Sequence, residues 1–144
     1  MIVYTVGTFD MLHVGHLRLL EHSQKLGSVV AVGVASDRVV HSYKPNKPVI
    51  PLEQRMQMLR ALRCVDIVIP YYDLEYVSGC RTVAADIFVV GEDWGTKAHN
   101  LAVEAYLLDQ GSEIVKVQYD LRTSSTQIKQ TVMAQPARKL AVAV

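Results

Sequence analysis

The stretch VYTVGTFDMLHVGHLRLLEH, residues 3–22, joins an apolar run to a segment of helical period through the turn GTFD. The apolar run predicts a buried strand, and the segment after the turn predicts a helix. If that helix begins around Leu12, His13 and His16 project from nearly the same side of its first turn, so both imidazoles can meet one ligand. Gly15 leaves room for a phosphate beside the backbone amides at the helix amino end. The start of this helix, with His13, Gly15 and His16, is therefore the predicted binding site for the phosphates of a nucleotide.

The rest of the chain alternates between apolar runs of strand length and segments of helical period, which is typical of a parallel sheet covered by helices. Strands are expected at residues 2–7, 28–35, 67–70, 86–91 and 113–119. Helices are expected at residues 14–27, 52–66, 74–85, 100–111 and 124–134, with Gly27 and Gly111 as plausible C-caps. The Lys- and Pro-rich residues 36–51 are expected to form a polar loop. The fold class is therefore α/β, a doubly wound (Rossmann-like) five-stranded parallel sheet in a single domain, residues 1–133, with a C-terminal tail at 134–144.

Composition narrows the class of protein. The chain has 144 residues, half of them apolar, which suits one compact core. Fifteen basic against fourteen acidic residues give no basic excess, so we expect no nucleic-acid partner. Without a leader-like start or a long apolar run, we expect no membrane contact and a cytoplasmic location. Cys64 and Cys80 are expected to be ordinary reduced residues, and the histidine pair lacks the spacing and third ligand of a zinc site.

Polar segments follow three of the expected strands. They are GTFDMLHVGH after the first strand, GEDWGTK after the fourth and DLRTSST after the fifth. A doubly wound sheet binds its ligands at the carboxyl ends of its strands, where the strand order reverses. The histidines, lysine, arginine and hydroxyl side chains in these segments suit a small molecule rich in phosphate.

The stretch GTFDMLHVGH resembles the G-x-F-D-x-x-H-x-G-H signature of the nucleotidyltransferase superfamily, and within it the cytidylyltransferases, especially those that act on glycerol 3-phosphate. GEDW at residues 91–94 and the later RTSST...IK extend this resemblance over roughly the first 130 residues. In that family an R-T-x-G-I-S-T-T segment closes over the triphosphate. This chain is shortened there, where the family has an acidic residue, glycine and isoleucine.

The resemblance implies a reaction in which the phosphate of a small acceptor attacks the α-phosphorus of CTP and releases pyrophosphate, with Mg²⁺ as cofactor. The catalytic residues that it implies, which would hold, bridge or grip the phosphates, are His13, His16, Lys44, Lys47, Arg55 and Arg122. The nucleotide-binding residues that it implies are Gly7, Thr8, Phe9, Asp10, Gly15, Gly91, Asp93, Trp94, Thr123, Ser124, Ser125 and Thr126. Asp10 would orient a ligand histidine or bind the magnesium ion.

For several of these residues, the sequence is also compatible with a purely structural role. Lys44 and Lys47 could belong to a solvated surface loop, and Arg55 could form a helix-end salt bridge with Glu53 or Asp66. Trp94 could pack on the ligand or only on the neighbouring helix.

The nucleotide and the acceptor stay open at this point. Asp93 could accept a hydrogen bond from the amino group of cytosine, and CTP is favoured because Arg122, Thr123 and Trp94 match the cytidylyltransferase pattern. Residues 44–62, in contrast, look like the matching stretch of heptose-phosphate adenylyltransferases and archaeal FAD synthetases, which use ATP. Glycerol 3-phosphate is the favoured acceptor, with choline phosphate, ethanolamine phosphate, another sugar phosphate or a phosphonate as alternatives. A homodimer is expected, and a nucleotide-binding sensor without turnover is the non-enzymatic alternative.

Overall fold

Residues 1–118 and 124–136 are described by a computed structural model of the protein. The strands are β1 (Ile2–Gly7), β2 (Val29–Ala35), β3 (Ile67–Tyr71), β4 (Ile87–Gly91) and β5 (Glu113–Val117). The helices are α1 (Val14–Leu26), α2 (Asp37–Tyr43), α3 (Leu52–Arg60), α4 (Val77–Val83), α5 (Ala98–Gln110) and α6 (Ser125–Ala134). None of the helices in these ranges combines the length and the apolar character that crossing a bilayer requires.

The strands form one parallel sheet in the order β3-β2-β1-β4-β5. This confirms the expected α/β fold with a five-stranded parallel sheet. The chain first builds outward from β1 to β3 and then crosses back to β4 and β5, so the strand order reverses between β1 and β4. Such a reversal opens a crevice at the carboxyl ends of the two strands, because their following segments turn to opposite faces.

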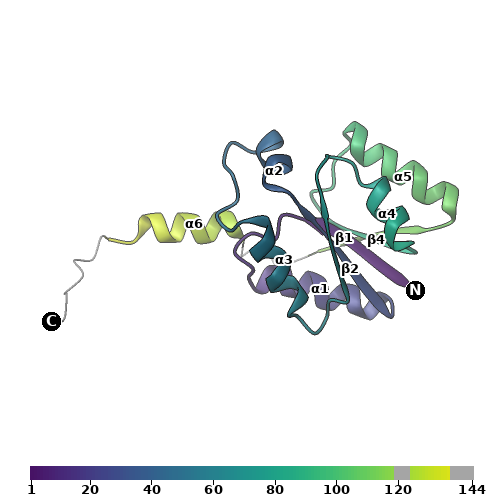
Figure 1. The fold of residues 1–144 in the computed structure, drawn as a ribbon, viewed down its shortest axis with the longest axis horizontal. Coiled ribbons are helices and arrows are strands. Elements are labelled where there is room, and N and C mark those ends of the chain that lie inside the picture. Colours follow the sequence, from purple (N-terminus) through teal and green to yellow (C-terminus); the bar gives the residue numbers. More distant parts are fainter. Residues whose placement is uncertain (119–123, 137–144) are drawn as a thin grey trace.

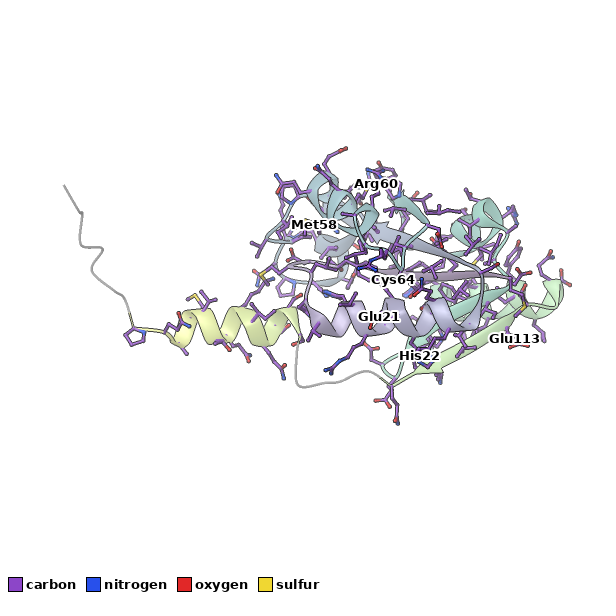
Figure 2. The ribbon with its side chains drawn as sticks, turned by 90° about the horizontal axis from the view of Figure 1, so that it is seen from below. Glu21, His22, Met58, Arg60, Cys64 and Glu113 are labelled. Atoms are coloured by element: carbon purple, nitrogen blue, oxygen red, sulfur yellow. The ribbon has the colours of Figure 1, made fainter. Side chains whose placement is uncertain are left out.

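Helices cover both faces of the sheet (Figure 1). On one face, α1 and α3 pack against β2 through a cluster that includes Leu20, Leu59 and Val32. Figure 2 is turned by 90° from this view and shows α1, which carries the labelled Glu21 and His22, and α3, which carries Met58 and Arg60. On the other face, α4 and α5 pack against β1 and β4 around Tyr4 and Phe88. Burial on both sides explains why β2 reads as an almost unbroken apolar run rather than an alternating one.

The sixth helix stands apart from these two layers. α6 leaves the body on the side where the strands end and extends away from it (Figure 1), and none of its residues is buried. Its first turn is tied to the body, because the Ser125 hydroxyl donates to the backbone carbonyl of Asp10. The expected tail begins at the end of this helix, and residues 137–144 lie outside the described ranges.

One sequence-based expectation about local structure was wrong. Residues 36–51 are not wholly a loop, because α2 occupies their first half, with its first turn capped by the Ser36 hydroxyl and ending before Pro45. The first helix begins at Val14, as the range 14–27 predicts, and Gly27 is its C-cap, as expected. The backbone of Gly27 is extended, and a Cβ atom there would lie 2.5 Å from the carbonyl oxygen of Met1, so close approach rather than a left-handed conformation requires glycine.

Candidate active site

A cavity of about 910 Å³ opens at the carboxyl ends of β1 and β4. The β1–α1 turn, the loop after α2, the β4–α5 turn and the start of α6 all contribute to its lining. Among the described residues that the sequence predicted for the site, those that line it are Gly7, Thr8, Phe9, Asp10, His13, Gly15, His16, Lys44, Lys47, Gly91, Asp93, Trp94, Ser124, Ser125 and Thr126. Arg55 is not among the lining residues, and Arg122 and Thr123 lie outside the described ranges.

The β1–α1 turn carries unusual backbone geometry. Phe9 and Met11 have φ angles of 52° and 49°, in the left-handed region that residues other than glycine seldom adopt. The buried Phe9 ring packs 5.3 Å from the ring of His16, measured between centroids. Strained backbone of this kind persists where surrounding contacts hold it, and it is common at functional sites. Here it directs the chain from the strand into α1 within the wall of the cavity.

His13 and His16 form a reciprocal cap at the start of α1. The Nδ1 atom of His13 accepts from the backbone N–H of Gly15 at 3.0 Å, and the Nδ1 atom of His16 accepts from the backbone N–H of His13 at 3.2 Å. The two rings stack with their centroids 3.8 Å apart. Because each Nδ1 is an acceptor, each neutral ring carries its proton on Nε2. The pair therefore offers Nε2–H donors at the helix amino end, where anions are favoured.

Both imidazoles are held in the neutral form. Burial lowers the pKa of His16 to about 4, with a further lowering by His13 that is partly opposed by Asp10. Burial also lowers the pKa of His13. Close to neutral pH the pair therefore acts through hydrogen-bond donation rather than as a pair of cations.

Acidification is expected to destabilise the fold through His16. Its folded-state pKa of about 4 lies below the ordinary value of 6.5, so the unfolded chain binds this proton first. The stabilising contribution is therefore complete above the ordinary pKa and is lost as the pH falls through the window between the two values. Its full size is of the order of 3 kcal/mol. Urea unfolding near pH 7 and near pH 4 measures it, and His16→Asn, which has no titrating ring, should show a clearly smaller loss than the wild type. Equal losses in the two proteins would contradict the assignment.

Asp10 is held by the loop after α2 and by α6, contacts that the sequence did not indicate. It is 5% exposed, and its carboxylate oxygens accept from the backbone N–H groups of Val49 and Ile50 at 2.8 and 2.9 Å. The ammonium of Lys129 lies 3.6 Å from the same carboxylate. In the described ranges, no cluster of three His, Cys, Asp or Glu side chains could hold a metal ion. Asp10 fastens the loop after α2 to the β1–α1 turn.

Arg55 also has a different place from the one expected. Its side chain is buried within the fold, where Nε donates to the carbonyl of Ile50 and Nη1 donates to the carbonyls of both Thr8 and Ala35. The remaining nitrogen pairs with the carboxylate of Asp37, not with Glu53 or Asp66. Because its donors are engaged by the chain, the expected two-donor grip on phosphate is incompatible with this arrangement. Arg55 ties the ends of β1 and β2 together beneath the cavity.

Lys44 and Lys47 lie on the loop between α2 and α3. Both are exposed and both line the cavity, so both interpretations, a solvated surface loop and a position beside a bound phosphate, are compatible with the structure. The backbone N–H of Lys44 caps α2 by donating to Val40. Asp10 holds the far end of this loop through Val49 and Ile50, and the ammonium group of Lys44 lies 5.7 Å from the centre of the Tyr43 ring.

The β4–α5 turn forms the opposite wall. The backbone N–H of Trp94 closes the turn by donating to the carbonyl of Gly91, and the Asn100 side chain accepts from the backbone N–H of Lys97. The indole N–H of Trp94 donates to Glu104 at 2.7 Å. Its ring packs on Tyr76 and Phe88, at centroid distances of 5.8 and 5.6 Å. Trp94 therefore packs on α5 and on the core, and its side chain also lines the cavity.

Several lining residues were not assigned from the sequence. Among them are His99 and Lys129. Lys129 follows RTSST at helical spacing, and this spacing is the signal that could have placed it on the same face of α6 as Ser125. The others come from helix ends and strand ends that meet only in the folded sheet. In the described part of the chain, the cavity lining contains four lysines and two carboxylates, those of Asp10 and Asp93.

Fold and site together define the class of protein: a nucleotide-binding α/β domain with a pair of donor histidines at the reversal of strand order. The sequence model of the cytidylyltransferase-like family matches residues 4–131, so the chain belongs to this family. This confirms the family indicated by the GTFDMLHVGH stretch. The family match does not identify the phosphorylated acceptor, so it does not confirm glycerol 3-phosphate.

Comparison with known proteins adds relatives that are longer than this chain. It is 35% identical over 138 residues to the bifunctional protein HldE of Pectobacterium carotovorum subsp. carotovorum (strain PC1), which is 95% of this chain and 28% of the relative. It is 36% identical over 132 residues to HldE of Yersinia pestis (strain Pestoides F), and this alignment covers 91% of this chain and 27% of that relative. The chain thus spans little more than a quarter of these relatives.

Two solved structures show the same fold. A lipopolysaccharide core biosynthesis protein from Thermoplasma volcanium GSS1 has a TM-score of 0.68 and 25% identity, with 83% of this chain and 96% of that chain covered. TmcAL from Thermotoga maritima, bound with alpha-thio ATP, has a TM-score of 0.62 and 14% identity. The match covers 92% of this chain and 50% of that chain. The second likeness concerns the fold alone.

Proposed function

We propose that the protein is a nucleotidyltransferase that joins the nucleotidyl group of a nucleoside triphosphate to a phosphorylated small molecule and releases pyrophosphate. The observation that carries this proposal is the stacked histidine pair with both Nδ1 atoms engaged. Neutral Nε2–H donors at a helix amino end can bind phosphate oxygens without exchanging protons with them. That arrangement suits a displacement at phosphorus, in which catalysis consists of positioning and charge stabilisation.

In the proposed reaction, an oxygen of the acceptor phosphate forms a bond to the α-phosphorus of the triphosphate. The bond between that phosphorus and the oxygen bridging to the β-phosphate breaks, and pyrophosphate leaves with the electron pair. His13 and His16 would stabilise the charge that builds up on the phosphate oxygens. Lys44 and Lys47 would act as point charges for the acceptor phosphate and the triphosphate. The excess of lysines over carboxylates in the lining supports a reaction between two anionic substrates.

ATP is the nucleotide that we place first. Residues 44–62 resemble the matching stretch of heptose-phosphate adenylyltransferases, and alignments of 132 to 138 residues with the HldE proteins must include this stretch. A sugar phosphate is then the corresponding acceptor. CTP with glycerol 3-phosphate is the second candidate, favoured by the GEDW segment and by Asp93, which could accept from the amino group of cytosine. Both candidates use the same phosphate-binding corner and differ at the wall formed by the β4–α5 turn.

Magnesium is expected to arrive with the triphosphate. Mg²⁺ keeps several waters and is commonly held by substrate phosphates with one or two carboxylates. Asp10 lines the cavity, and each of its carboxylate oxygens accepts one backbone N–H from the loop after α2. We also propose that the protein forms a homodimer, which light scattering on the full chain would test.

A pyrophosphate-release assay tests the proposed function. ATP, CTP, GTP and UTP are each combined with sugar phosphates, glycerol 3-phosphate and choline phosphate. We expect release only when a triphosphate and a phosphorylated acceptor are both present, with ATP preferred over CTP by about tenfold or more, the size of a typical base-specific contact. Preference for CTP would select the second candidate. No release with any combination would leave nucleotide binding without turnover, as in a sensor.

A further inference from the structure

We propose that Glu104 is a positioning residue that sets the nucleoside-facing wall of the cavity through Trp94. This inference rests on the proposed function, because it concerns the same cavity. Glu104 lies on α5 and does not line the cavity, whereas Trp94 does. The two are joined by the hydrogen bond from the indole N–H to the Glu104 carboxylate, 2.7 Å long and partly buried.

The indole of Trp94 needs this partner to keep one orientation. Its ring edge meets Phe88 in a T-shaped contact with an interplanar angle of 77°, and its face lies at 34° to the ring of Tyr76. Such ring contacts are weakly directional, so they restrict the indole less than a hydrogen bond does. A partly buried indole N–H without an acceptor carries a desolvation cost, and the ring would turn to recover one. The carboxylate of Glu104 therefore determines which surface of the Trp94 ring lines the cavity.

The same bond anchors the turn that carries Asp93. Within the turn, the Trp94–Gly91 backbone bond fixes only the local bend, and the Asn100–Lys97 bond fixes only the start of α5. The Trp94–Glu104 bond links the bend to the body of α5. Loss of that link is expected to disturb the nucleoside wall while leaving the phosphate corner at His13 and His16 intact.

A pair of substitutions separates this role from a general effect on folding. Glu104→Leu removes the acceptor, whereas Glu104→Gln keeps an Oε1 atom that can accept from the indole. Asp109→Ala, at the exposed end of the same helix, is the matched control. The chain has one tryptophan, so intrinsic emission reports on Trp94 directly.

We expect Glu104→Leu to shift the Trp94 emission to longer wavelength and to raise the KM for the nucleotide about tenfold, with kcat within about threefold of wild type, as befits one charge-assisted bond acting on binding. Glu104→Gln and Asp109→Ala should resemble the wild type in both measurements. Trp94→Phe, which lacks the donor, should raise KM similarly, and adding Glu104→Leu to it should change KM little further.

Three results would each overturn the proposal: wild-type emission and KM in Glu104→Leu, a Glu104→Gln protein as impaired as Glu104→Leu, or a full Glu104→Leu effect in the Trp94→Phe background. If Glu104→Leu does not fold, Trp94→Phe decides alone, and a wild-type KM in that variant would overturn the proposal. The emission comparison needs no turnover. It therefore remains decisive for the Trp94–Glu104 link even if no triphosphate and acceptor release pyrophosphate and the proposed function fails.

Discussion

Replacing His16 with asparagine is expected to lower kcat by about a hundredfold to a thousandfold, the usual effect of removing one preorganised donor from a charge-stabilising site. The asparagine side chain places an oxygen near the position of Nδ1, where it can still accept from the backbone N–H of His13. It has no atom at the position of Nε2. The variant therefore separates the capping role of His16 from its proposed role toward phosphate.

Steady-state kinetics measure kcat, and thermal melting of the same samples measures stability. His22→Asn is the matched control, because His22 lies exposed on α1, outside the cavity (Figure 2), and this variant should keep the wild-type rate. His16→Ala should lose the same activity and also some stability, since it removes the cap acceptor as well. A His16→Asn rate within about threefold of wild type would remove His16 from the proposed chemistry.

Replacing Arg55 with methionine is expected to lower the free energy of unfolding by about 3–5 kcal/mol, because three backbone carbonyls lose a buried, charged donor. The Asp37 side chain is 43% exposed, so loss of the ion pair itself adds little. The change would leave the carbonyls of Thr8, Ala35 and Ile50 without their donor and Asp37 without its partner. These carbonyls come from segments far apart in the sequence. The loss should therefore affect global unfolding rather than only one loop.

Urea unfolding monitored by circular dichroism measures this effect. Arg60→Met on the same helix is the control, because Arg60 is exposed and its loss should cost little. Arg55→Lys should fall between the two, since an ammonium keeps the charge but cannot reproduce the planar fork of donors. A free energy of unfolding for Arg55→Met within about 1 kcal/mol of that for Arg60→Met would show that the guanidinium network is not a main support of the fold.

Strand positions were the most predictable part of the fold. Parallel strands covered on both faces appear as continuous apolar runs, and β1 occupies the residues expected of it. The segment of α2 was harder, because a short helix with serine, aspartate, histidine and lysine in and around it has the composition of a loop. Its adjacent buried residues, Val39 and Val40, form a satellite cluster with Tyr71 and Leu74 that only the folded chain brings together.

The candidate site was predictable where its residues share one local motif. His13, Gly15 and His16 belong to a single strand–turn–helix unit, so their spacing was informative. The structural contacts of Arg55 and Asp10 were not predictable, because sequence reveals charge and not burial, and Ala35 and Ile50, which they bind, lie tens of residues away. The link between Trp94 and Glu104 joins a turn to a helix face, and the motif in which Trp94 appears does not contain it.

The central claim is that the acceptor phosphate itself attacks the triphosphate in this cavity. The most direct measurement uses an acceptor whose phosphate carries ¹⁸O in its non-bridging oxygens and follows the label by mass spectrometry during turnover by the full chain. The account predicts that the label appears in a nucleotidyl diphosphate product, with none in pyrophosphate and with product and pyrophosphate formed in equal amounts. Pyrophosphate released together with free nucleoside monophosphate, while the label stays in unchanged acceptor, would contradict it.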